Sequence, residues 1–216
     1  MQEKVKILTS KIPHGWKRQK TRLLVLAGRR KTGKDVFLSY VMRNYKGFRH
    51  YRITAAPLIA KVLEVEPTRQ VQHALFGVNA LLYPILGESA TVRRVAKILD
   101  RERPRLAIVE AARTREEFGE FVTNRKGVLI GIAADDQIRY ERAVADTRKI
   151  SEKRDEGAMT FKEFMKKESS PIEREIDWIV NRAHFILDNS SNKKAPFYGA
   201  IDGVMRQLGF KKRPRR

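Results

Sequence analysis

The sequence predicts an α/β fold in which a mostly parallel sheet of five strands is covered by helices on both faces. Short apolar runs rich in leucine and β-branched residues, without the alternation of a half-exposed strand, are typical of buried parallel strands. Stretches with helical features follow these runs, and strands that alternate with helices indicate a parallel sheet. The runs predicted as strands span residues 22–28, 48–53, 105–113, 127–134 and 183–189.

The helices are predicted from apolar spacing and from residues that favour helix ends. Residues 34–44 can place Phe37, Leu38, Val41 and Met42 on one face of a helix. Further helices are expected over 56–65, 68–86, 89–101 and 198–208, and in the charged stretch that begins at 136. Helix-start signals stand at Thr114, Thr160 and Ser170, the last of which is followed directly by a proline.

Length and composition indicate one soluble globular core. The chain has 216 residues, of which 42% are hydrophobic and 33% charged. Because no apolar run reaches the roughly 18 residues of a membrane span and the N-terminus lacks an apolar signal core, we expect a cytoplasmic protein without membrane contact. Cysteine is absent and the four histidines are scattered, so any metal is expected to be a hard cation held by oxygen.

The formal net charge of +21 is unevenly distributed. Residues 1–22 hold seven Lys or Arg and one Glu, and residues 211–216 hold five Lys or Arg. We therefore expect a basic N-terminal extension over 1–22, one domain over 23–210 and a basic tail over 211–216. Such ends can bind nucleic acid nonspecifically through counterion release, and solvated tails are the alternative.

The stretch from Gly28 to Lys34 carries the clearest chemical signal. It fits the pattern G-x-x-x-x-G-K and lies between a predicted strand and a predicted helix, which is the context that this pattern requires. Backbone amides between Gly28 and Gly33 can turn inward around a phosphate, and Lys34 can reach the outer phosphates of a nucleotide. The alternative is a basic turn between a strand and a helix.

Asp35 departs from the general pattern, because serine or threonine usually follows this lysine and coordinates Mg²⁺. With this aspartate, "GRRKTGKD" resembles the loops of phage-type deoxynucleoside monophosphate kinases and animal-type phosphomevalonate kinases, which are small-molecule kinases of the P-loop superfamily. The resemblance covers roughly residues 23–190. It implies the three-layer P-loop NTPase sandwich with a helical lid at about 139–170, and ATP and Mg²⁺ as cofactors.

The resemblance also implies roles for individual residues. Nucleotide contacts are implied for Gly28, Arg30, Lys31, Thr32, Gly33, Lys34, Asp35 and Asn189, the last near the base. Glu110 stands where the family has the aspartate of "DTR" or "DGIR", so Asp35 and Glu110 are the implied Mg²⁺ residues. Arg69, Gln72 and Arg113 are implied to bind the acceptor. Catalytic roles are implied for Lys34, Asp35, Arg113 and the lid residues Arg139 and Arg142.

Each of these side chains also has a purely structural alternative. Arg139 and Arg142 could be solvated helix residues, and Arg69 could face solvent. Glu110 could form an ion pair with Arg113 or Lys34, and Asn189 could end a strand and begin a turn.

Three functions remain open from the sequence. The first is ATP-dependent phosphoryl transfer to a small phosphorylated acceptor, with a nucleoside or deoxynucleoside monophosphate ahead of dephospho-coenzyme A and phosphomevalonate. The second is a nucleic-acid-associated P-loop ATPase or RNA-binding factor, in which Trp16 could stack on a base. The third is a degenerate member that binds a nucleotide without transferring its phosphate.

Overall fold

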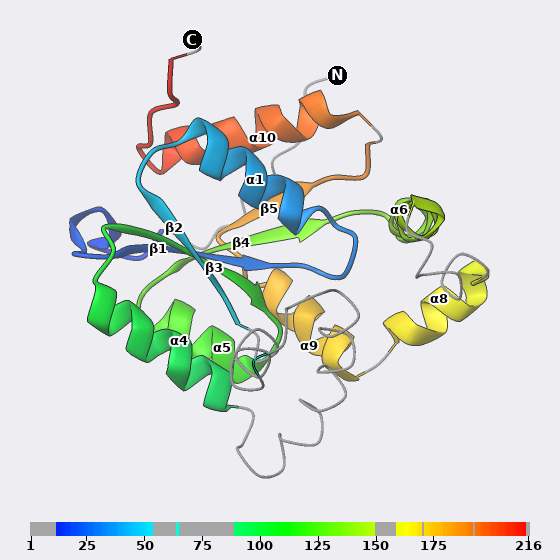
Figure 1. Ribbon diagram of the computed structural model, residues 1–216, viewed down its shortest axis with the longest axis horizontal. Coiled ribbons are helices and arrows are strands. Elements are labelled where there is room, and N and C mark those ends of the chain that lie inside the picture. The colour runs from blue at the N-terminus through cyan, green and yellow to red at the C-terminus, as the bar shows by residue number, and fades with distance from the viewer. Residues whose placement is uncertain are drawn as a thin grey trace.

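The computed structural model describes residues 12–53, 64, 89–149, 159–169, 171–191 and 193–214. Its centre is a five-stranded sheet in which all neighbouring strands are parallel (Figure 1). In spatial order the strands are β2 (Phe48–Arg52), β3 (Leu106–Ala112), β1 (Arg22–Ala27), β4 (Val128–Ala133) and β5 (Phe185–Asp188). The predicted strands and the predicted fold class are confirmed, whereas the helices expected within 54–63 and 65–88 lie outside the described residues.

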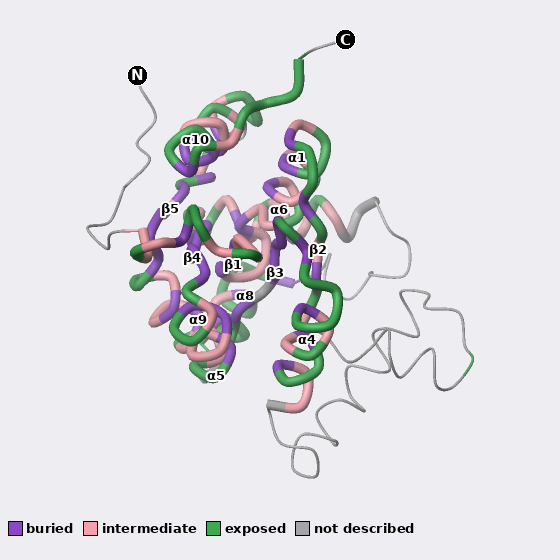
Figure 2. Tube along the Cα trace, turned by 90° about the vertical axis from the view of Figure 1, so that its left-hand side faces the viewer, coloured by how far each residue is buried: buried purple, intermediate pink, exposed green. Residues whose placement is uncertain are grey.

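Alternate residues of the central strand face two separate hydrophobic layers. Leu24 and Leu26 belong to one core, and Leu23 and Val25 belong to the other. The first core includes residues of α1 (Lys34–Asn44) and α10 (Lys194–Gln207). The helical elements on the second side are α4 (Ser89–Glu102), α5 (Arg115–Phe118), the π-helical segment η2 (Gly119–Asn124) and α9 (Pro171–Val180). Figures 1 and 2 show these two helical layers on opposite faces of the sheet.

The helix starts agree with the capping signals. Thr114 and Thr160 each form a capping box with the glutamate three residues later. Helix α10 begins four residues before the predicted Tyr198, because its Pro196 lies in the first turn, where the missing amide hydrogen removes no helical hydrogen bond. Gly209, predicted as the stop, follows this helix with a φ of 79°.

Two helices stand beside the carboxyl ends of the strands, where the lid was expected (Figure 1). These are α6 (Asp136–Lys149) and α8 (Phe161–Glu168). They share a small core of Ala143, Met159 and Phe164, and the Tyr140 hydroxyl donates to the Met159 carbonyl at 2.9 Å. That these helices move as a lid stays a prediction.

The segment before β1 packs onto the domain. Trp16 is only 1% exposed, and its indole Nε1 donates to the Leu23 carbonyl at 3.3 Å. Its ring meets Phe210 edge to face, with centroids 6.0 Å apart. Trp16 is therefore part of the core and is not placed to stack on a nucleobase, although it lies in the range predicted as an extension.

The described part of the basic tail is also held by the domain. Lys212 forms an ion pair with Asp202 of α10 at 2.7 Å, and its ammonium also donates to the Tyr40 hydroxyl. Arg213 donates from its amide to the Asn44 carbonyl at 2.8 Å, and from its side chain to the Tyr45 carbonyl at 3.2 Å. The tail thus covers the end of α1, where cations favour the helix dipole.

Within the described ranges, no helix has the length and apolar character needed to cross a membrane.

His184 gives the fold a defined dependence on pH. Its Nδ1 accepts a hydrogen bond from the Leu129 amide at 2.9 Å, so the ring must be neutral with its proton on Nε2. Burial lowers the pKa of His184, whereas an unfolded histidine has a pKa of about 6.5. Below that pH the unfolded chain binds a proton that the folded ring does not bind. The free energy of unfolding should therefore fall by up to about 1.4 kcal/mol for each pH unit below about 6.5.

Urea unfolding at several pH values between 5 and 8 measures this loss. A His184→Gln variant should show a shallower slope in this range, since it lacks the titrating ring. Equal slopes in the two proteins would contradict the assignment.

Candidate functional site

The loop between β1 and α1 has the tight curvature that the glycine pattern predicts. Gly28, Lys31 and Gly33 have φ values of 156°, 62° and 104°, which bring the chain back on itself. A Cβ on Gly28 would lie 2.5 Å from the Ile132 carbonyl oxygen of β4, so only glycine fits there. The first residue of the loop therefore lies directly against the backbone of the neighbouring strand β4.

Lys34 closes this loop from within. Its ammonium donates to the carbonyls of Gly28 at 2.6 Å and Arg29 at 2.8 Å. Burial and the nearby Arg113 charge lower the pKa of Lys34 to about 8. A partly desolvated ammonium whose hydrogen-bond partners are two neutral carbonyls is well placed for an anion.

The backbone donors beside Lys34 are free to bind. Helix α1 begins at Lys34 with no side-chain cap from Gly33. Among the residues that the structure describes, no partner is found for the amides of Thr32, Gly33, Lys34 and Asp35. Unpaired amides at the start of a helix, next to a lysine, form an anion-binding site.

Polar contacts hold the loop against the surrounding helices. Arg29 forms a two-pronged ion pair with Asp177 of α9, with Nε donating to Oδ1 at 2.7 Å. Lys31 forms an ion pair with Asp146 of α6. The Asn189 amide after β5 donates to the Thr32 carbonyl at 2.8 Å. The Asn189 side chain therefore contacts the backbone of the loop, and its place near a nucleobase stays a prediction.

The ends of β2 and β3 bring a second polar group beside the loop. Glu110 is buried and accepts hydrogen bonds from His50 Nε2 at 2.9 Å and Arg52 Nε at 3.3 Å. Burial alone would raise the pKa of Glu110, but the hydrogen bond from His50 and the charge of Arg52 hold it at about 2. The Asp35 carboxylate also meets Arg52, at 3.7 Å, so the two predicted Mg²⁺ residues converge on one guanidinium.

Arg113 lies just beyond β3 and is exposed. Its backbone amide donates to the Glu117 carboxylate, which also accepts from the Thr114 amide at 3.0 Å and belongs to the capping box. Desolvation raises the pKa of Glu117 to about 7. These hydrogen bonds fix the backbone at Arg113. Besides burial, the positive charge of Arg113 lowers the pKa of Lys34.

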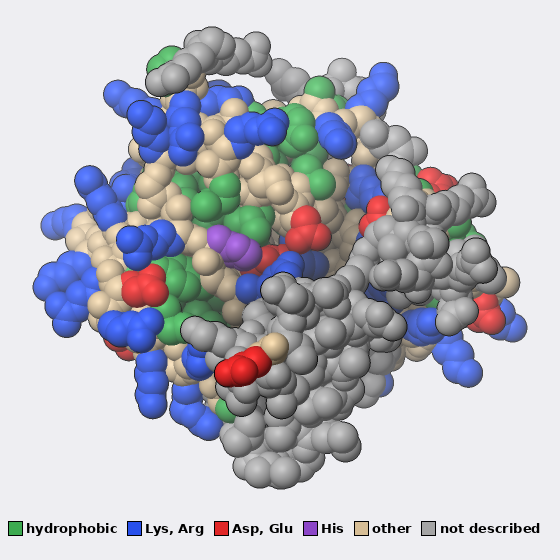
Figure 3. Space-filling model, viewed as in Figure 1, with side chains coloured by type: hydrophobic (Ala, Val, Ile, Leu, Met, Phe, Trp, Pro, Cys, Tyr) green, Lys and Arg blue, Asp and Glu red, His purple; other side chains and the backbone are tan. Residues whose placement is uncertain are grey.

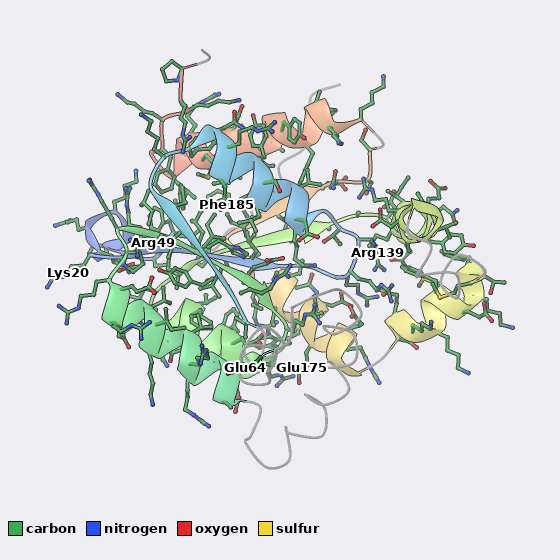
Figure 4. The ribbon with its side chains drawn as sticks, viewed as in Figure 1. Lys20, Arg49, Glu64, Arg139, Glu175 and Phe185 are labelled. Carbon is green, nitrogen blue, oxygen red and sulfur yellow. The ribbon has the colours of Figure 1, made fainter. Side chains whose placement is uncertain are left out.

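The two lid arginines are both engaged with the protein. Arg139 is 1% exposed and forms an ion pair with the equally buried Glu168 of α8. Arg139, which is labelled in Figure 4, also donates to Asp136 at 2.6 Å and to the Arg30 carbonyl at 3.3 Å. Because Arg139 is buried and paired in this way, it is not a solvated helix arginine.

Arg142 joins the loop to the end of β5. Its guanidinium donates to the carbonyls of Lys31 at 3.3 Å, Asn189 at 2.8 Å and Ser191 at 3.0 Å. Both arginines therefore contact carbonyls of the loop between β1 and α1, and the prediction that they clamp a phosphoryl group stays a prediction. Arg69 and Gln72 lie outside the described residues.

Four further residues contact this site and were not predicted as part of it. They are His50, Arg52, Glu168 and Asp177. His50 and Arg52 stand at the carboxyl end of a predicted strand, a position that could have marked them, since ligands of parallel sheets bind there. Asp177 has no local signal, because its partner Arg29 is 148 positions away.

Comparison with known proteins supports the same architecture. No protein-family model matches this sequence, and neither does any curated protein. The structure is similar to shikimate kinase from Bacteroides thetaiotaomicron, with a TM-score of 0.52 and 11% identity over 87% of this chain and 98% of that chain. It is also similar to TT1252 from Thermus thermophilus, with a TM-score of 0.50 and 14% identity over 88% of this chain and 99% of that chain. The chain therefore shares its fold with these two proteins.

The residues of the loop between β1 and α1 fit a bound polyphosphate. The glycine cradle, the free amides and Lys34 offer donors and positive charge without an opposing acid inside the loop. Figure 3 shows Lys and Arg side chains over much of one face, with acidic side chains among them near its centre. The donors and the positive charge of the loop thus suit an anionic ligand.

The residues also fit Mg²⁺, though less completely. Asp35 and Glu110 supply carboxylate oxygens, which are the ligands that this ion prefers. The cation between them is now Arg52, and its pair with the 83% exposed Asp35 is weak. Within the described ranges, neither this place nor any other has a group of three or more potential metal ligands.

Gly33→Ala tests the close fit of the loop. A Cβ there would lie 2.3 Å from Asn189 Nδ2, and the backbone has a φ of 104°. We expect a loss of about 1–3 kcal/mol in the free energy of unfolding from backbone strain, together with weaker nucleotide binding because the contact between Asn189 and Thr32 is displaced. Urea unfolding and ATP titration measure the two effects.

Gly203→Ala is the matched control. Gly203 lies within α10 and an added Cβ would meet nothing within 4 Å. This variant should bind ATP normally and gain up to about 1 kcal/mol in stability. Equal behaviour of the two variants would contradict the fit described for Gly33.

Proposed function

We propose that this protein is an ATP-dependent kinase that transfers a phosphoryl group to a small phosphorylated acceptor. The observation that carries the proposal is the loop from Gly28 to Asp35, in which the Lys34 ammonium bonds two loop carbonyls beside backbone amides that have no partner among the described residues. The fold of the P-loop kinases supports it. Nucleoside and deoxynucleoside monophosphates, dephospho-coenzyme A and phosphomevalonate are the candidate acceptors.

The loop residues would bind the donor nucleotide. We propose that the amides from Arg30 to Asp35 hold its phosphates and that Lys34 neutralises the charge that develops during transfer. Asn189, which contacts Thr32, would lie near the base. Mg²⁺ would be held at Asp35 and Glu110 and would supply positive charge to the phosphate oxygens.

The arginines around the loop would orient the acceptor and the transferred group. Arg113 is exposed beside Lys34 and is proposed to bind the acceptor, together with Arg69 and Gln72. We assign Arg142 to the transferred phosphoryl group, which it would reach from the carbonyls that it now contacts. Arg139 is proposed to position the loop through the Arg30 carbonyl.

An ADP-release assay with Mg-ATP and the panel of acceptors tests this function. At least one acceptor should raise ADP release well above the rate with ATP alone. Stimulation by RNA or DNA, with no response to any acceptor, would instead support the nucleic-acid-associated ATPase. Nucleotide binding without turnover under all conditions would support a degenerate member of the fold.

A further inference from the structure

The outer edge of β2 carries a groove to which no role has yet been given. Among the described residues, β2 pairs only with β3, and its five residues follow that strand in an unbroken parallel register. β2 is therefore an edge strand, and Figure 2 shows it at the end of the sheet between α1 and α4. An edge strand presents backbone N–H and C=O groups that no neighbouring strand binds.

The groove follows the whole length of this edge. Its volume is about 630 Å³, and every residue of β2 lines it. Phe48 belongs to the core beside α1 and Tyr51 to the core beside α4, so the hollow runs along the edge and is not confined to one face of the sheet. At a rise of about 3.3 Å per residue, the strand spans roughly 16 Å. The other lining residues are Met42 of α1 and Thr91, Arg94, Val95, Ile98 and Glu102 of α4.

The two sides of the groove offer different chemistry. On the side of α1, Met42 is 37% exposed and is one of only two large hydrophobic side chains that are exposed among the described residues. On the side of α4, Arg94 is exposed and forms no ion pair within the described ranges. Arg49, labelled in Figure 4, pairs with Glu102 at 3.1 Å, but its side chain is 61% exposed. An exposed pair of this kind is weak, so Arg49 can exchange partners.

A peptide strand matches both the backbone and the side chains of this groove. It carries amide donors as well as carbonyl acceptors, which are the two kinds of group that an edge strand leaves unbound. Its side chains point alternately to opposite sides. Carboxylates at every second position can therefore meet Arg49 and Arg94, while apolar side chains between them meet Met42. Methionine adapts readily to apolar partners of different shape.

A nucleic acid fits the groove less well, although its phosphates would suit the arginines. A phosphodiester backbone carries acceptors only, so it would leave the outward carbonyls of β2 without donors. The aromatic rings in the groove belong to Phe48 and Tyr51, which are only 7% and 9% exposed. They therefore offer no free face on which a base could stack.

A second copy of this chain is also a poor occupant. Pairing of two β2 edges across a twofold axis would bring the same residues of both copies together. Arg49, Arg52 and Arg94 of one groove would then face their own counterparts. Like charges opposite one another destabilise a strand pair, so the arginines select against this chain's own edge and favour an acidic strand.

We propose that the edge of β2 binds an extended segment of a partner protein in which acidic and apolar residues alternate. The segment adds a strand beside β2, so that main-chain hydrogen bonds supply affinity and the alternating side chains supply selectivity. This surface is independent of the proposed kinase activity, and none of the measurements below uses ATP.

Fluorescence anisotropy of the full chain with a labelled peptide of alternating glutamate and valine tests the proposal. We expect saturable binding that is lost when lysine replaces glutamate in the peptide. It should also be lost when every backbone nitrogen of the peptide is methylated, because such a peptide cannot donate to the β2 carbonyls. Hydrogen exchange of the amides over residues 48–52 should slow when the unmodified peptide is present.

Arg94→Glu is the decisive variant, because it reverses a charge that lines the groove at an exposed position. The Kd for the peptide should rise by about tenfold, since an attraction becomes a repulsion. The melting temperature should stay unchanged, which shows that the fold is intact. Lys97→Glu is the matched control, as Lys97 is exposed on the same helix and is not part of the groove lining. It alters the net charge equally, and its Kd should stay within about twofold at physiological salt.

Several results would overturn the proposal. Absence of saturable peptide binding would do so, as would equal losses in Arg94→Glu and Lys97→Glu, which would show attraction by the overall charge alone. Unchanged exchange over residues 48–52 would place the peptide elsewhere. Binding of labelled oligouridine that only Arg94→Glu weakens, without peptide binding, would assign the groove to nucleic acid. A dimer in sedimentation equilibrium whose β2 amides are protected without peptide would assign it to a second copy.

Discussion

Lys34→Ala will abolish detectable ATP binding and reduce acceptor-dependent ADP release by at least about 10²-fold. The Lys34 ammonium lies within the loop, where it bonds the Gly28 and Arg29 carbonyls. The buried site is already partly desolvated, so no water-exposed cation can replace it. Isothermal titration with ATP and the ADP-release assay measure the two losses.

Thermal stabilisation by ATP gives an independent test of the same variant. A ligand at 100 times its Kd adds about 2.7 kcal/mol to the free energy of unfolding. This increment should be present in the unchanged protein and absent from Lys34→Ala. Lys46→Ala, at an exposed lysine beyond the end of α1, should keep it. Normal ATP stabilisation in Lys34→Ala would reject the phosphate-binding loop.

Glu168→Ala will cause the largest loss of stability among single substitutions around the site. It leaves the fully buried Arg139 guanidinium without its main partner, and breaking a buried ion pair in this way costs about 3–5 kcal/mol. For a chain of this length the melting temperature should fall by roughly 10 °C. Arg29 and Arg30 also lose a nearby charge, at 3.8 and 3.9 Å, so ATP binding should weaken.

A second substitution shows whether the unpaired charge is the cause. In Glu168→Ala with Arg139→Met, the buried cation is removed as well, and the double variant should regain part of the lost stability. Glu141→Ala, at an exposed position of α6, should change the free energy of unfolding by less than about 0.5 kcal/mol. Additive losses in the double variant would contradict a coupled pair.

Local patterns predicted the sheet and the curvature of the loop from Gly28 to Lys34, because both depend on residues close together in the sequence. The buried runs, the capping boxes of Thr114 and Thr160, and the positive φ values of the loop glycines are all local features of the chain. The same reasoning identified Lys34 and the i, i+3 arginines of α6. Their chemical roles stay proposals.

Contacts between distant segments could not be predicted in this way. Arg139 is buried because α8 supplies Glu168 29 positions later, and nothing in the charged α6 sequence marks that pairing. In the sequence, Glu173 is an ordinary acidic residue of a first helical turn. Only the packing of α9 shows that one of its carboxylate oxygens is buried. Trp16 likewise stands in a basic stretch, and only the assembled sheet explains its burial.

The anchoring of Lys212 and Arg213 affects how the excess positive charge should be studied. Cutting the chain after Phe210 would remove positive charge. It would also remove the contacts of Lys212 with α10 and of Arg213 with the last turn of α1. Weaker nucleic-acid retention by such a shortened protein could then reflect loosened packing and not lost charge. Neutral replacement of the exposed Lys211, with the contacts of Lys212 and Arg213 left in place, separates the two causes.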